Sequence, residues 1–224
     1  MLSTRWSTSL PTSIGYRRKL GFLGMEAVMM ARSIPEITSF ISEVERVAGP
    51  EVAATVVGES VVDSGSKPKD RALWLAAAIK KLRGSVDPEA YRQIMRGCGA
   101  QCARQHRAVK TTLERRRKYQ SLEEFLLEEQ KDPPAGTRLV VEGRTIYQYY
   151  SPTKAKERQK CFCPVMRHLP ETKTAPSGYC ECSGAYLETV WSAILGEPAK
   201  VEVLETCLTG AQECVFRIRP KNSG

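Results

Sequence analysis

The cysteines are the residues of this sequence best suited to chemistry, and most of them occur in close pairs. Cys161 and Cys163 form one Cys-x-Cys pair, and Cys180 and Cys182 form a second pair after a segment rich in proline. Each pair offers two thiolates, and two such pairs can converge on a tetrahedral zinc ion. The same soft donors suit copper(I) or an iron–sulfur cluster. The spacing therefore predicts a metal site made of these four thiols, and reduced buried thiols are the competing interpretation.

A third pair, Cys98 and Cys102, lies one helical turn apart in a stretch that contains glycines. If a helix begins at Gly99, the Cys98 thiol lies near the positive end of the helix dipole, which makes Cys98 or Cys102 a candidate catalytic nucleophile. The alternative is a close helix crossing that requires glycine and buries both thiols. Only two histidines are present, His106 and His168, so a histidine-rich metal site is excluded.

Composition narrows the class of protein. The 224 residues are 42% apolar and 26% charged, which is ordinary for a globular chain of one substantial domain or two small ones. No apolar run approaches the roughly 18 residues that a membrane-spanning helix requires, so no membrane partner is expected. Cysteines in close pairs predict a reducing, cytoplasmic location rather than a disulfide framework. A homodimer is compatible with the sequence.

The formal net charge of +9 raises the question of nucleic acid as a partner. The basic residues are divided among separate segments, and the block at 115–118 is followed closely by a run of glutamates. No recognised nucleic-acid reader motif accompanies the charge, which argues against such a partner. A basic nucleic-acid adaptor stays as an alternative, and it requires residues 115–118 and 154–158 to share one surface.

The first 32 residues have a composition of their own. Residues 1–32 are rich in Ser, Thr and Arg and poor in acidic residues, as organellar transit peptides are. Met25, Met29 and Met30 offer alternative starts, so residues 1–24 either form a tail or precede the native start. We expect residues 1–32 to be a disordered or transit-like tail.

A helical region is expected over residues 33–134. Helical spacing of apolar residues predicts a helix over 71–82, and Asp87 before a proline predicts the start of another. The Gly-Cys-Gly at 97–99 predicts an interruption of that second helix, with a further helix over about 100–118.

The cysteine-rich region, residues 135–224, has a mixed pattern. Residues 138–150 predict a β-hairpin around a glycine-containing turn, and 182–195 predict a helix. Two strands are predicted over 201–207 and 214–219. We therefore predict the α+β class: an N-terminal helical half, then a hairpin, a helix and two antiparallel strands that form a small sheet packed on helices.

Residues 178–219 resemble the four-vinyl reductase domain, a small-molecule-binding module of archaeal proteins and of the sensor regions of aromatic-responsive bacterial regulators. The resemblance rests on Cys180 before a helix, on Gly-Glu-Pro at 196–198 after it, and on Glu-Thr-Cys at 205–207 and Cys-Val-Phe at 214–216. The whole chain is similar to a family of bacterial and archaeal cysteine-rich proteins of unassigned function that is related to this domain.

The resemblance implies an alternative zinc site. In such sensor domains the ion is held by a cysteine before the helix, a glutamate and two strand cysteines. These correspond here to Cys180, Glu205 or Glu202, Cys207 and Cys214. The loop between the last two cysteines is one residue shorter than is usual in that family. On local spacing we prefer the site made of the two Cys-x-Cys pairs, and Cys207 and Cys214 are alternatively core residues.

These patterns favour a zinc-containing, small-molecule-binding or sensor-like protein. Its small apolar or aromatic ligand would lie in a pocket lined by Tyr186, Trp191 and Phe216, which are alternatively plain core. The aminothiazoline-carboxylate hydrolase family has a similar cysteine-rich C-terminal end, so the resemblance also allows a hydrolase that uses a metal-bound water or a cysteine nucleophile. No Ser-His-Asp order, phosphate-binding glycine loop or His-Glu-x-x-His motif is present.

Overall fold

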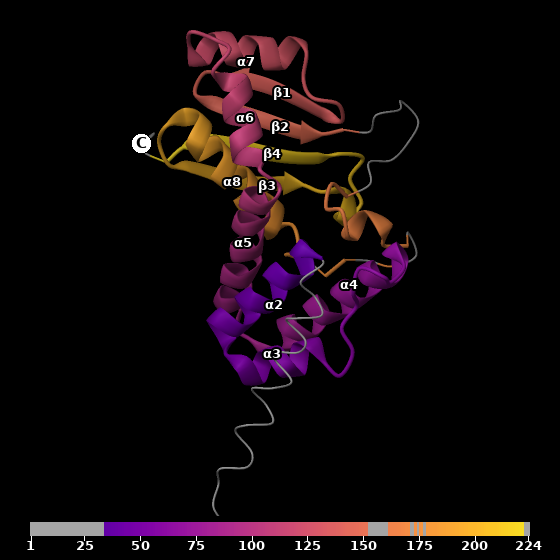
Figure 1. The fold of residues 1–224 in the computed structure, drawn as a ribbon. Coiled ribbons are helices and arrows are strands. Elements are labelled where there is room, and N and C mark those ends of the chain that lie inside the picture. The colour runs from indigo at the N-terminus through magenta and orange to yellow at the C-terminus, as the bar shows by residue number, and fades with distance from the viewer. Residues whose placement is uncertain (1–33, 152–160, 171–172, 174, 177, 222–224) are drawn as a thin grey trace, which may run out of the picture.

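The computed structural model describes residues 34–151, 161–170, 173, 175–176 and 178–221 (Figure 1). The tail predicted over 1–32 lies outside these residues. In chain order the elements are the helices α2 (Pro35–Ala48), α3 (Pro50–Val57), α4 (Pro68–Ser85), α5 (Pro88–Gln105), α6 (Ala108–Arg116) and α7 (Leu122–Lys131), the strands β1 (Thr137–Glu142) and β2 (Thr145–Tyr150), the 3-10 helix η1 (Met166–His168), α8 (Glu181–Leu195), β3 (Ala199–Glu205), the 3-10 helix η2 (Cys207–Thr209) and β4 (Cys214–Pro220).

Helices α2 to α4 and the first half of α5 form one end of the molecule, and the sheet with α7 forms the other (Figure 1). Each of α2 to α5 begins with a proline. Proline is suited to that position because its missing N–H would have had no partner within the helix. The carboxylate of Asp87 caps α5 by accepting hydrogen bonds from the backbone N–H groups of Glu89 and Ala90. The predicted helix at 71–82 and the predicted start at Asp87 are confirmed.

Helix α5 is continuous through Gly97 and Gly99, so the interruption predicted there is wrong. Both glycines allow neighbouring helices to pack closely against α5. A Cβ at Gly99 would collide with the backbone carbonyl of Cys182 in α8, and a Cβ at Gly97 would collide with the carboxylate of Glu43 in α2. The chain turns instead at Arg107, whose φ of 56° separates α5 from α6. The structure therefore has the close helix crossing that was the alternative interpretation of this stretch.

The four strands form one antiparallel sheet in the order β1-β2-β4-β3. The hairpin between β1 and β2 turns at Gly143, whose φ of 59° suits a residue without a side chain. Along β4, Cys214, Phe216 and Ile218 are buried and alternate with more exposed residues. The predicted hairpin and both C-terminal strands are confirmed, except that Cys207 lies in η2, just after β3 has ended.

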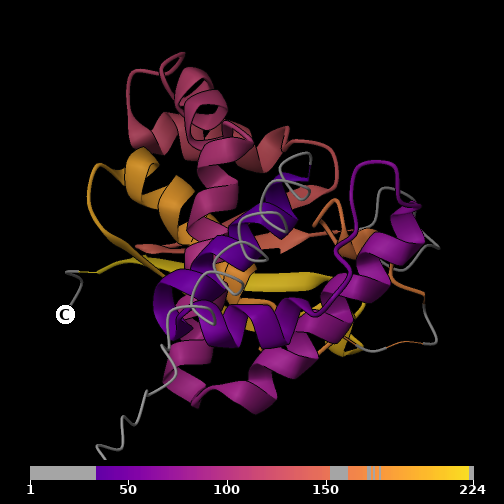
Figure 2. The ribbon, with the colours of Figure 1, turned by 60° about the horizontal axis from the view of Figure 1, so that its bottom comes forward.

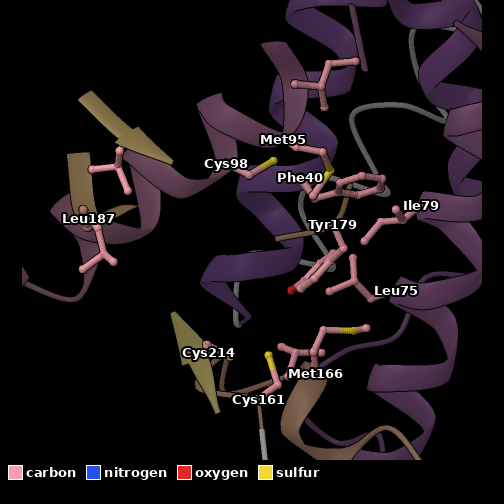
Figure 3. Packing of buried hydrophobic residues seen from close by; sticks show 14 of the residues in the cluster. Phe40, Leu75, Ile79, Met95, Cys98, Cys161, Met166, Tyr179, Leu187 and Cys214 are labelled. Carbon is pink, nitrogen blue, oxygen red and sulfur yellow. The ribbon is translucent and has the colours of Figure 1, made fainter. Parts of the chain in front are cut away.

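Helix α8 packs on one face of the sheet against β3 and β4, α5 packs against α8, and α7 lies along β1 (Figures 1 and 2). The buried residues form a single cluster that joins Phe40 and Ile79 of the helical region to Phe216 and Ile218 of the sheet. Figure 3 shows Phe40, Met95 and Ile79 gathered beside Tyr179, which precedes α8. The α+β class is confirmed. Within the described residues, no helix has the length and apolar character needed to span a membrane.

Candidate functional site

A cavity of about 340 Å³ lies where α5 and α8 meet the inner face of the sheet. Most of its wall is apolar, and much of it is aromatic. The aromatic rings come from well-separated parts of the chain, and they include Phe40, Phe125, Tyr150, Phe162, Tyr186 and Trp191. The predicted pocket residues Tyr186 and Trp191 thus line this cavity. Phe216 does not line it; it is buried in the core, with its ring 5.2 Å from that of Tyr150.

Local periodicity explains how α8 and β2 present side chains to the cavity. Leu187, Trp191 and Ile194 are spaced at helical intervals on α8 and share the face that lines the cavity. On β2, Gln148 lies two residues from the buried Tyr150, so both side chains point to the inner face of the sheet. The indole N–H of Trp191 donates a hydrogen bond of 2.7 Å to Oε1 of Gln148. This bond joins the helix to the central part of the sheet.

The acidic and basic side chains in the cavity wall occur in pairs. Nε2 of His106 lies 2.8 Å from Oε1 of Glu36, a residue that is buried in α2. The guanidinium of Arg115 donates two hydrogen bonds of 3.0 Å each to the two carboxylate oxygens of Glu129. All four of these side chains line the cavity. The wall therefore carries no acidic or basic side chain that lacks such a partner among the described residues.

Four thiols face this cavity: Cys98 and Cys102 from α5, Cys163 from the loop before η1, and Cys182 from α8. Burial raises the pKa of Cys98 well above its ordinary value, and it raises the pKa of Cys102 to about 12, with further contributions from Cys163 and Glu36. A nucleophilic cysteine needs the opposite shift. Because Cys98 lies in the middle of a continuous helix, it also lacks the helix dipole on which its candidacy as a nucleophile depended.

Cys207 and Cys214 form a separate thiol pair at the end of the sheet. Their sulfur atoms are 3.5 Å apart, and the backbone N–H of Cys207 donates to the Cys214 sulfur at 3.3 Å. The hydrogen bond between the two thiols lowers the pKa of Cys214 to about 7 and raises that of Cys207. The pair is therefore suited to hold one proton between two sulfurs, or to bind a cation that replaces that proton.

Two further cysteines lie beside this pair, and each comes from a different Cys-x-Cys motif. The ring of Phe162 stacks on Tyr150 at 4.1 Å, and Tyr150 is directly opposite Cys214 in the sheet, so residue 161 is brought to the same sheet end. Figure 3 shows Cys161 next to Cys214. The Thr206 hydroxyl donates to Cys180, which places Cys180 beside η2.

The electrostatics of the four thiols agree with this placement. Burial raises the pKa of Cys161, the neighbouring Cys163 thiol raises it further, and Cys180 and Cys214 make smaller contributions in the same direction. The charges of Cys161 and Cys180 in turn contribute to the raised pKa of Cys207. Cys161, Cys180, Cys207 and Cys214 are called the sheet-end thiols below.

The two predicted metal sites are thus neighbours that overlap. Cys163 and Cys182 turn toward the cavity, whereas Cys180 and Glu205 line a second hollow of about 210 Å³. Glu202 is paired with arginines on the other face of the sheet. As the side chains stand in the described part of the chain, no group of three or more His, Cys, Asp or Glu is arranged to hold a metal ion. Binding of a metal there would require the thiols to close around it.

Glu36 and Gln148 are two polar residues of the cavity that sequence reasoning missed. Glu36 has no signal in the sequence beyond its place in the first turn of a helix, where acidic residues are common. Gln148 does have a signal in the sequence. It is a polar residue two positions from Tyr150 and Ile146, which are buried, so strand alternation places its side chain on the inner face of the sheet. Of the basic segments that a nucleic-acid adaptor requires, 154–158 lies outside the described residues, and Arg115 is engaged by Glu129.

Comparisons with known proteins place the chain in a family. No curated protein matches it. Among solved structures, an H-NOX protein from S. oneidensis in the Fe(II) ligation state shares 13% identity over 84% of this chain and 96% of its own, with a TM-score of 0.43. An H-NOX from Shewanella woodyi shares 12% identity over 84% of this chain and 94% of its own, with a TM-score of 0.41. At such scores these likenesses are too loose to assign a ligand or cofactor here. The model of DUF6144, described as a family of unknown function, matches residues 28–224, and the chain belongs to that family.

Proposed function

We propose that this chain is a sensor-like protein that binds a small, largely apolar molecule in the cavity between α5, α8 and the sheet. The observation that supports this best is the cavity itself, with a volume of about 340 Å³ and walls made mostly of apolar and aromatic side chains. Ligand pockets are typically roughly 300–1,000 Å³ and have a mainly apolar lining with a few polar groups. An unfilled apolar cavity reduces stability, so a molecule of matching size gains by filling it.

The binding of a simple hydrocarbon tests this proposal. Isothermal titration with isopropylbenzene is expected to give saturable binding at one site per chain, and the same compound is expected to raise the melting temperature. Val190→Phe places a larger side chain in the cavity wall and should abolish binding. Val215→Phe makes the same change on the opposite face of the sheet and should leave binding intact. The absence of binding to the wild-type protein would refute the proposal.

We also propose that the sheet-end thiols hold a zinc ion. The donor chemistry fits, because four thiolates at about 2.3 Å from a tetrahedral ion would have sulfur atoms about 3.8 Å apart. The sulfur atoms of Cys207 and Cys214 are 3.5 Å apart, and Cys161 and Cys180 lie beside them. This set takes Cys161 and Cys180 from the Cys-x-Cys pairs and Cys207 and Cys214 from the alternative site. Copper(I) or an iron–sulfur cluster would accept the same donors.

Metal content per chain, measured by mass spectrometry on protein purified anaerobically without a tag, distinguishes the three candidate ligand sets. The sheet-end set predicts that Cys161→Ser and Cys207→Ser each remove the zinc and that Cys163→Ser, a matched control, keeps it. Loss with Cys161→Ser and Cys163→Ser alone would favour the paired Cys-x-Cys site. Loss with Cys207→Ser but not with Cys161→Ser would favour the site with Glu205. No metal in the wild-type protein would refute the zinc proposal and leave the cavity proposal standing.

A further inference from the structure

Among the hydrogen-bonding groups of the cavity, the side-chain amide of Gln148 has an orientation that is fixed by its neighbour Trp191. The indole nitrogen of Trp191 can only donate, so the group of Gln148 that faces it at 2.7 Å must be the carbonyl oxygen. This assignment removes the usual ambiguity between the oxygen and nitrogen of a glutamine side chain. The amide NH₂ of Gln148 is therefore turned away from Trp191.

That NH₂ group has no hydrogen-bond acceptor among the described residues. The only hydrogen bond of the Gln148 side chain in this part of the chain is the one that its oxygen accepts from Trp191. The residue is half-buried on the inner face of the sheet, and it lines the cavity. A donor that a ligand covers without accepting from it loses its hydrogen bond to water, so a bound molecule gains by offering an acceptor at that point.

The charges of the wall select against an ionic ligand. Glu36 is paired with His106, and Arg115 is paired with Glu129 through two hydrogen bonds. An ion placed among these aromatic rings would lose its hydration, which is costly, and the acidic and basic groups of the wall are already engaged with one another. A neutral molecule meets no such penalty.

We propose that the ligand of this cavity is a neutral, largely apolar molecule that carries a hydrogen-bond acceptor, such as a carbonyl oxygen, and that the acceptor receives a hydrogen bond from the Gln148 amide. This inference rests on the proposed function and adds the chemical class of the ligand. Gln148 is the residue that determines specificity, and Trp191 is a positioning residue that holds its amide in the correct orientation.

Acetophenone and isopropylbenzene are suitable probes, because they have nearly the same shape and differ in a carbonyl oxygen where the hydrocarbon has a methyl group. The ketone is hydrated more strongly than the hydrocarbon in water, which weakens its binding to any apolar site. The ratio of the two dissociation constants is therefore measured in wild type and in Gln148→Leu, and the two ratios are compared. We expect the substitution to move that ratio by roughly tenfold against acetophenone, because one buried hydrogen bond is lost. The hydration of the free probes is the same in both titrations and cancels.

A second measurement needs no variant. In the amide NMR spectrum of wild-type protein, saturating acetophenone should shift the side-chain NH₂ signals of Gln148 more than saturating isopropylbenzene does. If both probes bind wild type but the ratio is unchanged in Gln148→Leu and the NH₂ signals respond equally, this inference is overturned while the proposed function stands. If neither probe binds wild type, the proposed function fails, and this inference fails with it.

Discussion

Gly99 of α5 lies against the backbone carbonyl of Cys182 in α8, so closely that there is no room between them for a side chain. The Cα of Cys182 is 2.9 Å from the position that a Cβ on Gly99 would occupy. This contact sets the distance between α5 and α8, the two helices that line one side of the cavity. It also brings Cys98 and Cys182 into the same wall.

Gly99→Ala is therefore expected to lower the free energy of unfolding by about 2–4 kcal/mol, because backbone atoms of α8 must move to admit a methyl group. Urea denaturation measures the loss. Gly84→Ala is a matched control in α4, where a Cβ would meet nothing within 4 Å, and it should be neutral or raise stability by up to about 1 kcal/mol. Equal effects of the two substitutions would contradict the close crossing.

Gly97→Ala should cost less than Gly99→Ala, although both positions are crowded. The atoms that a Cβ at Gly97 would meet belong to the carboxylate end of Glu43, a side chain that can rotate. Glu43 is hydrogen-bonded to Gln101 and Arg46, and moving it breaks those bonds. We expect a net loss of roughly 1 kcal/mol by urea denaturation, after the gain in helix propensity is counted. A loss as large as that of Gly99→Ala would show that Glu43 cannot move.

The half-buried thiol of Cys102 predicts a loss of stability in alkali. Its pKa rises from 9.0 in the unfolded chain to about 12 in the folded protein, chiefly through burial. Because the pKa is higher in the folded state, the protonated thiol contributes its full share to the free energy of unfolding below pH 9. That contribution disappears as the pH rises toward 12. Three pKa units correspond to at most about 4 kcal/mol. In metal-free protein, Cys102→Ala should make the free energy of unfolding fall less steeply between pH 9 and pH 12, and an unchanged slope would contradict the prediction.

The Cys207 and Cys214 thiols should form a disulfide when metal-free protein is treated with the oxidant diamide. Their sulfur atoms need to move from 3.5 Å to about 2.05 Å, a small shift. Both thiol hydrogens go to diamide, which is reduced to its hydrazine. Peptide mass mapping should find this pair linked, and zinc should protect it if the sheet-end thiols bind the metal. Equal oxidation with and without zinc would count against those ligands.

The sequence predicted elements where the decisive signals are local. Asp87 before a proline marked the start of α5, and the helical spacing over 182–195 marked α8. The predicted interruption at Gly97 and Gly99 was wrong because helix propensity is a local quantity, whereas these two glycines are required by close contacts with α2 and α8. Such contacts join residues that are tens of positions apart, and spacing alone does not reveal them.

The same limit applies to the candidate site. Spacing grouped Cys161 with Cys163 and Cys180 with Cys182, but the two cysteines of each motif lie in different surroundings here. Cys163 and Cys182 line the cavity, while Cys161 and Cys180 lie with the cysteines of the sheet end. Only the pairing of β2 with β4, and the stacking of Phe162 on Tyr150, bring Cys161 to Cys214.

The central claim is that a small molecule occupies the cavity beside Trp191. The most direct test is the indole N–H region of the NMR spectrum during a titration with isopropylbenzene. Trp74 is an internal control, since its indole N–H donates to the backbone oxygen of Ser60 at 2.8 Å and does not line the cavity. We predict that the Trp191 signal shifts and saturates while the Trp74 signal stays in place. No shift of Trp191 at saturating hydrocarbon, or equal shifts of both signals, would contradict the account.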